Sequence, residues 1–183
     1  DVGRDTTYGT DNDFIDDKSQ SLRSKLSYEL ADNWQLRHTL GVFKLNSDFD
    51  NTYVTNVNTT TNQVVRQHWQ QDLTTRNVFN NLELEGGFST FGLEHRLLSG
   101  LELGSQRRDP KLYNAATTAP GNSAVPTLDL YHPDRNIVHT GRMQVFSDSH
   151  TEVESRAIYL QDQLRLNDQW QLLAGVRYDT FDV

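Results

Sequence analysis

Three groups of residues in this sequence have side chains of the types that carry out chemistry. Residues 148–150 read Asp-Ser-His, the groups of a hydrolytic triad, but neighbours on a strand point to opposite faces. His38 and His95 could begin a metal site, which would need a third, convergent ligand. The acidic run at residues 11–17 has carboxylates that suit Ca²⁺, but it lacks the glycine and the terminal glutamate of an EF-hand loop. We therefore predict that the protein is not an enzyme, with no catalytic residues, no covalently bound cofactor and no metal site.

The composition limits which elements can position these residues. The chain has 183 residues, a net charge of −8, no cysteine and a mean hydropathy of −0.70. The acidic balance argues against nucleic acid as a partner, because binding phosphates requires clustered Lys and Arg. No stretch approaches the roughly 18 consecutive apolar residues that a membrane helix needs. The three tryptophans lie in patterned segments, so we do not expect a disordered chain.

The strongest pattern in the sequence is alternation of apolar and polar residues. Leu22, Leu26, Tyr28 and Leu30, for example, share one parity, and charged or small residues take the other. The same pattern recurs at residues 34–42, 78–85, 91–103, 158–166 and 170–179. A period of two indicates strands with one apolar and one polar face, and here it predicts about six strands.

The links between these segments alternate between short and long. We expect short turns at about residues 31–33, 87–90 and 167–169, and long loops at about 1–18, 50–66 and 109–150. Transmembrane β-barrels have this order, with short periplasmic turns and long external loops. Residues 34–56 and 64–86 look extended for about twice the 9–11 residues of a membrane strand, which predicts a hairpin that continues beyond the lipid.

An aromatic residue follows each short turn. The repeats WQLRHTL at 34–40, FGLEHRL at 91–97 and WQLLAGV at 170–176 place Trp34, Phe91 and Trp170 first, on the apolar face. Aromatic rings at matched depth are typical of a membrane-interface girdle. A soluble β-sandwich that binds ligands is the weaker alternative, because it would avoid exposing such a band.

Several motifs resemble those of TonB-dependent siderophore receptors. YLQDQLRL at 159–166, followed by Trp170 and LAGVRYD at 173–179, is similar to a barrel hairpin of that family. LRSKLSYELADNWQL at 22–36, LLSGLE at 97–102 and YGTDNDF at 8–14 resemble other barrel segments in the same order. TLDLYHP at 127–133 resembles an external-loop segment but lacks the Tyr-Gly that usually follows the proline.

This resemblance implies that residues 1–183 are an all-β segment of an antiparallel up-and-down transmembrane β-barrel, without the family's plug domain. It implies a fragment of an outer-membrane receptor that imports ferric siderophores with energy from TonB. The implied partners are an Fe(III)-siderophore as cargo, outer-membrane lipid and the TonB complex, which would act through the missing plug and TonB box. The alternative is a barrel without a plug, either a porin-like channel or an adhesin or translocator.

The candidate ligand-binding residues lie in the expected upper strands and loops. Arg107 and Arg108 end an upward strand, where cations could attract an anionic ferric chelate. The other candidates are on the rim hairpin and in the largest loop: Tyr53, His68, Trp69, Tyr113, Tyr131 and His132. For each of these residues, a packed or solvated loop position is the alternative. Charged residues on the polar face, among them Glu83, Glu85, Arg96 and Arg177, are expected to form cross-strand pairs.

The resemblance is compatible with several transported ligands. These are a ferric siderophore of any class, cobalamin, haem or another metal chelate.

Overall fold

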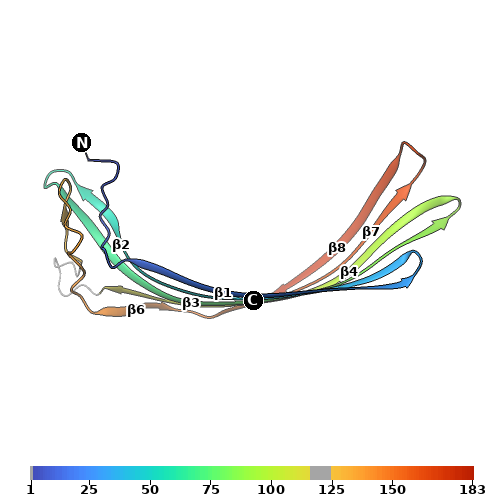
Figure 1. The fold of residues 1–183 in the computed structure, drawn as a ribbon, viewed down its shortest axis with the longest axis horizontal. Helices are drawn as coiled ribbons and strands as arrows, with labels where there is room; N and C mark the ends of the chain where they lie inside the picture. Colours follow the sequence, from blue (N-terminus) through green and yellow to red (C-terminus); the bar gives the residue numbers. More distant parts are fainter. Residues whose placement is uncertain (1, 116–124) are drawn as a thin grey trace. The chain divides into compact units, whose positions relative to one another are not determined.

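The computed structural model describes residues 2–115 and 125–183 (Figure 1). The strands are β1 (Phe14–Ala31), β2 (Trp34–Asn58), β3 (Gln63–Thr90), β4 (Leu93–Ala115), β5 (Leu128–Asp129), β6 (Met143–Asp148), β7 (Thr151–Arg165) and β8 (Gln171–Asp182). The long strands are hydrogen-bonded in the order β1-β2-β3-β4-β7-β8, with β5 paired to β3 and β6 to β4. Within the described ranges, no helix is long and apolar enough to cross a membrane.

The predicted all-β class and the six long strands are confirmed. Strand β7 pairs antiparallel with β4 from Thr151 to Arg165 and with β8 from Glu154 to Arg165. Figure 1 shows β7 and β8 side by side, joined by a short connection. The two short strands β5 and β6 were not predicted, because both lie inside the segment 109–150 that we expected to be a loop.

The predicted turns agree with the structure at two of three places. Asp32 and Asn33 join β1 to β2, and residues 166–170 join β7 to β8. The turn predicted at 87–90 is wrong, because β3 continues to Thr90. Phe91 and Gly92 make this turn instead, with φ angles of 52° and 81°. Two consecutive positive φ angles are the mark of a tight hairpin turn, and Gly92 adopts one without steric cost.

Phe91 therefore does not begin an upward strand as predicted. It lies in the turn and is fully exposed. Trp34 does begin β2, and Trp170 lies immediately before β8. The prediction that all three aromatic residues begin an upward strand at the same depth is therefore wrong for Phe91.

Gly86 has a packing role that explains why the Gly-Gly pair is not a turn. A Cβ at Gly86 would overlap the indole ring of Trp34, which lies over this position on the neighbouring strand. At Gly87, the nearest atom to an added Cβ is the carbonyl oxygen of His95, at an ordinary 3.6 Å. The Gly87 N–H also donates to the Asn33 carbonyl oxygen at 2.9 Å. The glycines therefore sit inside the sheet, where the first makes room for a ring.

The loop predicted at 50–66 is mostly strand. β2 runs to Asn58 and β3 begins at Gln63, so only residues 59–62 connect them, with Asn62 at a φ of 54°. The β-branched residues of this stretch, such as those in TYVT at 52–55, favour extended backbone. The predicted N-terminal loop is also shorter, since β1 starts at Phe14.

The chain divides into two compact units. Unit 1 comprises Asp1–Lys18, Leu45–Thr74 and Asp109–His150; unit 2 comprises Ser19–Lys44, Thr75–Arg108 and Thr151–Val183. Strands β1 and β2, like β3 and β4, contribute residues to both units. Unit 1 holds most of the buried apolar side chains, namely Val64, Val125 and Leu128.

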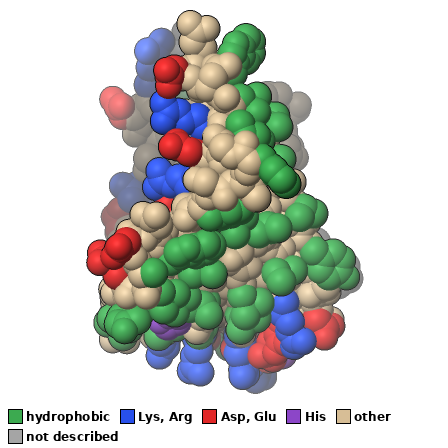
Figure 2. Space-filling view, turned by 90° about the vertical axis from the view of Figure 1, so that its right-hand side faces the viewer, with side chains coloured by type: hydrophobic (Ala, Val, Ile, Leu, Met, Phe, Trp, Pro, Cys, Tyr) green, Lys and Arg blue, Asp and Glu red, His purple; other side chains and the backbone are tan. Residues whose placement is uncertain are grey.

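Unit 2 leaves one row of apolar side chains exposed on several of its strands. Leu22, Leu26 and Tyr28 in β1, and Val176 and Tyr178 in β8, are each more than three-fifths exposed. Figure 2 shows hydrophobic side chains gathered over one side of the molecule, with charged side chains along its margins. Soluble domains rarely leave such a band in water.

The opposite parity of unit 2 carries the predicted charge pairs. Arg37 Nε lies 2.7 Å from Glu83 and Arg96 lies 2.6 Å from Glu85, both across neighbouring strands. Arg177 pairs with Glu102 at 3.1 Å. The prediction that these charged residues pair across strands is confirmed.

The packing of Trp34 against Gly86 gives the first testable prediction. In the full-length protein, Gly86→Ala should lower the free energy of unfolding by about 1–3 kcal/mol, because the new Cβ forces the Trp34 ring out of its place. Gly87→Ala is the matched control and should change it by less than about 1 kcal/mol. Urea unfolding followed by tryptophan fluorescence measures both, and equal effects would contradict the role given to Gly86.

Candidate functional site

Unit 1 is built on the outer part of the β2–β3 hairpin, which has two different faces. One face is covered by the N-terminal segment and by residues 125–141. Tyr8 donates its hydroxyl hydrogen to the Leu130 carbonyl oxygen at 2.7 Å, and the Leu130 N–H donates to Asn62. Strand β5 pairs with the start of β3, joining Val64 to Leu128. These contacts place two distant segments over the same strand.

Three alternate residues of β3 point into this covered face. Val64, Arg66 and His68 are 0%, 1% and 4% exposed. Alternate residues of a strand share a face, so the burial follows directly from their spacing. Two of the three are polar, and each buried polar group must therefore find a partner within the unit.

Arg66 satisfies its guanidinium group with backbone carbonyl oxygens. It donates twice to Pro126, once to Tyr8 and once to Ile137, at 2.9–3.2 Å. Burial lowers the pKa of Arg66, and the nearby Asp13 carboxylate partly opposes that effect. One side chain on β3 thus holds the N-terminal segment and two points of the 125–141 segment.

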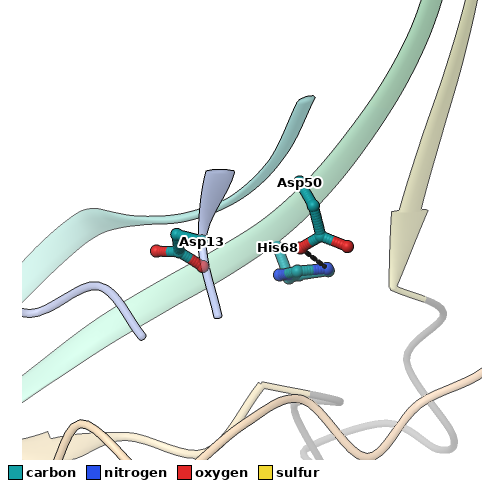
Figure 3. Close-up of side chains that lie close together, drawn as sticks. All are labelled: Asp13, Asp50 and His68. Carbon is teal, nitrogen blue, oxygen red and sulfur yellow. Dashed lines mark ion pairs between the residues drawn. The ribbon is translucent and has the colours of Figure 1, made fainter. Parts of the chain in front are cut away.

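Asp13, Asp50 and His68 converge beside Arg66 (Figure 3). Asp13 immediately precedes β1, Asp50 lies in β2 and His68 in β3. One ligand atom of each lies within 4.8 Å of the others, and His68 Nε2 is 3.1 Å from Asp50 Oδ1. Burial lowers the pKa of His68, although Asp50 opposes the shift, so the ring is neutral at pH 7.

Each member of this group is held by neighbours. Thr10 donates its N–H and its hydroxyl hydrogen to the Asp13 carboxylate, at 2.9 and 2.6 Å. Burial would raise the pKa of Asp13, but hydrogen bonds from Thr10 and Thr52 outweigh it, so the pKa is lowered. His68 Nδ1 lies 2.8 Å from Thr52 Oγ1, and its ring stacks on His139 with the centroids 4.0 Å apart.

The other face of the hairpin carries the aromatic surface, which we define as Tyr53, Gln67, Trp69 and Phe146. Gln67 Oε1 accepts hydrogen bonds from the Tyr53 hydroxyl at 3.3 Å and from Trp69 Nε1 at 3.2 Å. Trp69 also meets Phe146 of β6 edge to face, with the centroids 4.7 Å apart. Tyr53 and Phe146 are exposed, so this surface can be reached by a ligand.

The structure separates the predicted ligand-binding residues into several places. His68 is enclosed, and its ring is not open to a bulky ligand from the surface. Tyr113 donates to Asp72 at 3.3 Å within unit 1. Tyr131 and His132 follow β5, where both backbone N–H groups donate to Asp129. Arg107 and Arg108 belong to unit 2, where their backbone positions in β4 lie opposite Glu152 and Thr151 of β7.

Sequence reasoning missed the residues that organise unit 1. Arg66 gave no signal beyond its parity with His68, because its partners are backbone carbonyl groups. Asp13 and Asp50 were assigned to the loops predicted at 1–18 and 50–66, and the acidic run around Asp13 was considered as a metal site only in the form of a Ca²⁺ loop of the EF-hand type. Thr52 was not singled out, although its parity with Asp50 places both on the covered face.

Comparisons with known proteins find similarity along nearly the whole chain, and they indicate one family. A family model described as TonB dependent receptor-like, beta-barrel matches residues 1–183. The chain is 24% identical over 183 residues to the catecholate siderophore receptor Fiu of Escherichia coli, covering 95% of this chain and 23% of that protein. It is 27% identical to the probable TonB-dependent siderophore receptor PiuA of Acinetobacter baumannii, covering 99% of this chain and 26% of that protein.

The solved structure of PiuA aligns with 98% of this chain at a TM-score of 0.82 and 26% identity, and 28% of that structure is covered. The chain therefore spans about a quarter of the length of the curated relatives it matches. The predicted transmembrane barrel fold is confirmed by these likenesses.

The role of Arg66 gives a second prediction. In the full-length protein, Arg66→Lys should increase hydrogen exchange in residues 5–13 and 125–138, because lysine cannot reach all three carbonyl groups. Each buried carbonyl oxygen left without a donor costs about 1–3 kcal/mol. Arg135→Lys is the control, since Arg135 joins the same segments through an exposed pair with Asp11, worth at most about 1 kcal/mol. Exchange that rises equally in both variants would contradict the assignment.

Proposed function

The chain belongs to the family of TonB-dependent receptor-like β-barrels, and on that basis we propose that it forms part of an outer-membrane receptor that imports a ferric siderophore. The observation that carries this proposal is the family match over all 183 residues. It is supported by relatives named as siderophore receptors, among them Fiu and PiuA. Transport by such a receptor moves an Fe(III)-siderophore as cargo and involves no covalent step, in line with the prediction that the protein is not an enzyme.

The properties of unit 2 support a place in the outer membrane. Its exposed apolar row suits contact with lipid hydrocarbon, and its charge pairs suit the polar lumen of a barrel. Closure of the sheet requires additional strands, because an unpaired strand edge in lipid leaves backbone groups unsatisfied at several kcal/mol each. The plug, the TonB box and the contact with the TonB complex would belong to parts of the receptor outside these residues.

We assign ligand contact to the aromatic surface of unit 1. Flat, rigid rings contribute large contact area at a low entropic cost, and indole and phenol groups also offer a polar edge. Tyr113, Tyr131 and His132 lie in the same unit and extend the set of candidates. Arg107 and Arg108 remain candidates to attract an anionic chelate.

Uptake tests the proposed function directly. A strain that lacks the full-length receptor should lose uptake of radioiron supplied as one ferric siderophore, and the intact gene should restore it. A panel of ferric catecholate and non-catecholate chelates identifies the class. If the strain takes up every chelate at the rate of its parent, the receptor assignment is wrong.

The aromatic surface gives a third prediction. Trp69→Ala should weaken binding of the transported chelate to the purified full-length receptor by about 30-fold or more, because a Trp that dominates a binding surface contributes about 2 kcal/mol or more. Trp170→Ala removes an equally large, exposed ring from unit 2 and should leave the Kd unchanged. Isothermal titration measures both values. If the wild-type receptor restores uptake but Trp69→Ala leaves the Kd unchanged, the receptor assignment stands. The assignment of ligand contact to the aromatic surface is then wrong.

A further inference from the structure

A group of three side chains in unit 1 has the composition of a cation site. Asp13, Asp50 and His68 come from three segments that are far apart in the sequence, yet one ligand atom of each lies within 4.8 Å of the others (Figure 3). Tetrahedral ligands that bind one zinc ion at about 2.0–2.2 Å lie about 3.3–3.6 Å apart. The most widely separated of the three atoms therefore need to approach by roughly an ångström to share an ion.

The second observation is an unsatisfied atom that is aimed into this group. His68 is 4% exposed, and within the described residues its Nε2 atom has no hydrogen-bond partner. Asp50 Oδ1 lies only 3.1 Å away, but the contact does not have hydrogen-bond geometry. Buried polar atoms nearly always have partners, so an orphan beside a carboxylate oxygen requires a physical reason.

His68 Nδ1 lies 2.8 Å from Thr52 Oγ1, and a hydroxyl group can either donate or accept this hydrogen bond. When Thr52 accepts it, Nδ1 carries the proton and Nε2 keeps its lone pair, which is the form in which histidine binds a metal. In that tautomer neither Nε2 nor Asp50 Oδ1 has a hydrogen to donate, although the two atoms lie 3.1 Å apart. A cation bound by both atoms would relieve their repulsion.

The surroundings of the group match those of a metal site. A metal-binding histidine usually donates its other N–H to an oxygen that fixes the ring. Thr52 Oγ1, 2.8 Å from His68 Nδ1, is in position to accept that hydrogen bond. Gln70 donates to Asp50 Oδ2 and leaves Oδ1 free. The nearby Arg66 is a positive charge that opposes a cation, but two carboxylates outweigh it, so the group keeps a net negative charge before the ion binds.

We infer that Asp13, Asp50 and His68 bind a divalent transition-metal ion of the zinc class, with Thr52 and Gln70 as positioning residues. An imidazole together with two carboxylates suits Zn²⁺ better than Ca²⁺ or Mg²⁺, which prefer oxygen ligands alone. The ion is distinct from any iron carried as cargo. It ties the segment before β1 to the β2–β3 hairpin and therefore stabilises unit 1, whether or not the receptor transports a siderophore.

The test is zinc binding by the purified full-length receptor, stripped of metal and free of siderophore. Isothermal titration with zinc chloride should show that wild type binds one more ion per chain than His68→Asn or Asp50→Asn. Thr52→Val keeps the ligands and should weaken that site by about 10- to 100-fold. Cobalt chloride in place of zinc should give visible d–d absorption that the same variants lose.

The matched controls remove an exposed Asp–His pair. His132 and Asp129 lie 3.6 Å apart at the surface of unit 1, and His132→Asn or Asp129→Asn should leave the zinc stoichiometry unchanged. Zinc should also raise the unfolding temperature of wild type but not that of Asp50→Asn, a near-isosteric change that keeps the fold. Equal zinc stoichiometry in wild type and His68→Asn, or no zinc bound by wild type, would overturn the inference.

Discussion

The architecture depends on one constraint of the β-strand, namely that successive side chains point to opposite faces. In unit 2 this separates an apolar row from paired charges such as Arg37 and Glu83. In unit 1 the same period places His68 in the covered interior and its neighbour Trp69 on the aromatic surface. Two adjacent residues of one strand thus lie on faces with different roles. A shift of one residue in the register of β3 would place Trp69 on the covered face and His68 on the aromatic surface.

The interior of unit 1 is stabilised by polar contacts to an unusual degree. Val64 and Leu128 contribute apolar burial, but the larger part of the covered face of β3 is occupied by Arg66 and His68. Buried polar groups are stable only when their partners are fixed, which explains why Thr10 and Thr52 surround Asp13. Such an interior specifies one arrangement of the segments that cover it, because any other leaves charges without partners.

Much of the fold could be predicted from the sequence, because alternation is a local property. It located six strands and two of three turns, and the family motifs indicated the barrel. The turn predicted at 87–90 lies instead at Phe91 and Gly92. Glycine can mark either a turn or a space for a neighbouring ring, and only the position of Trp34 shows that Gly86 provides such a space. The Asp50–His68 pair gave no local signal. Its members are brought together by the register of two strands, and register depends on the whole sheet.

Arg66 has a consequence for which substitutions this chain can tolerate. Its guanidinium group contacts only backbone oxygens of Tyr8, Pro126 and Ile137, and every residue type presents the same carbonyl group. These contacts with Arg66 are therefore insensitive to the side chains that the covering segments carry at the three positions, although the Tyr8 hydroxyl and the β3–β5 pairing attach the segments as well. A substitution of Pro126 or Ile137 leaves the guanidinium contacts available, whereas a substitution of Arg66 removes all of them in one step.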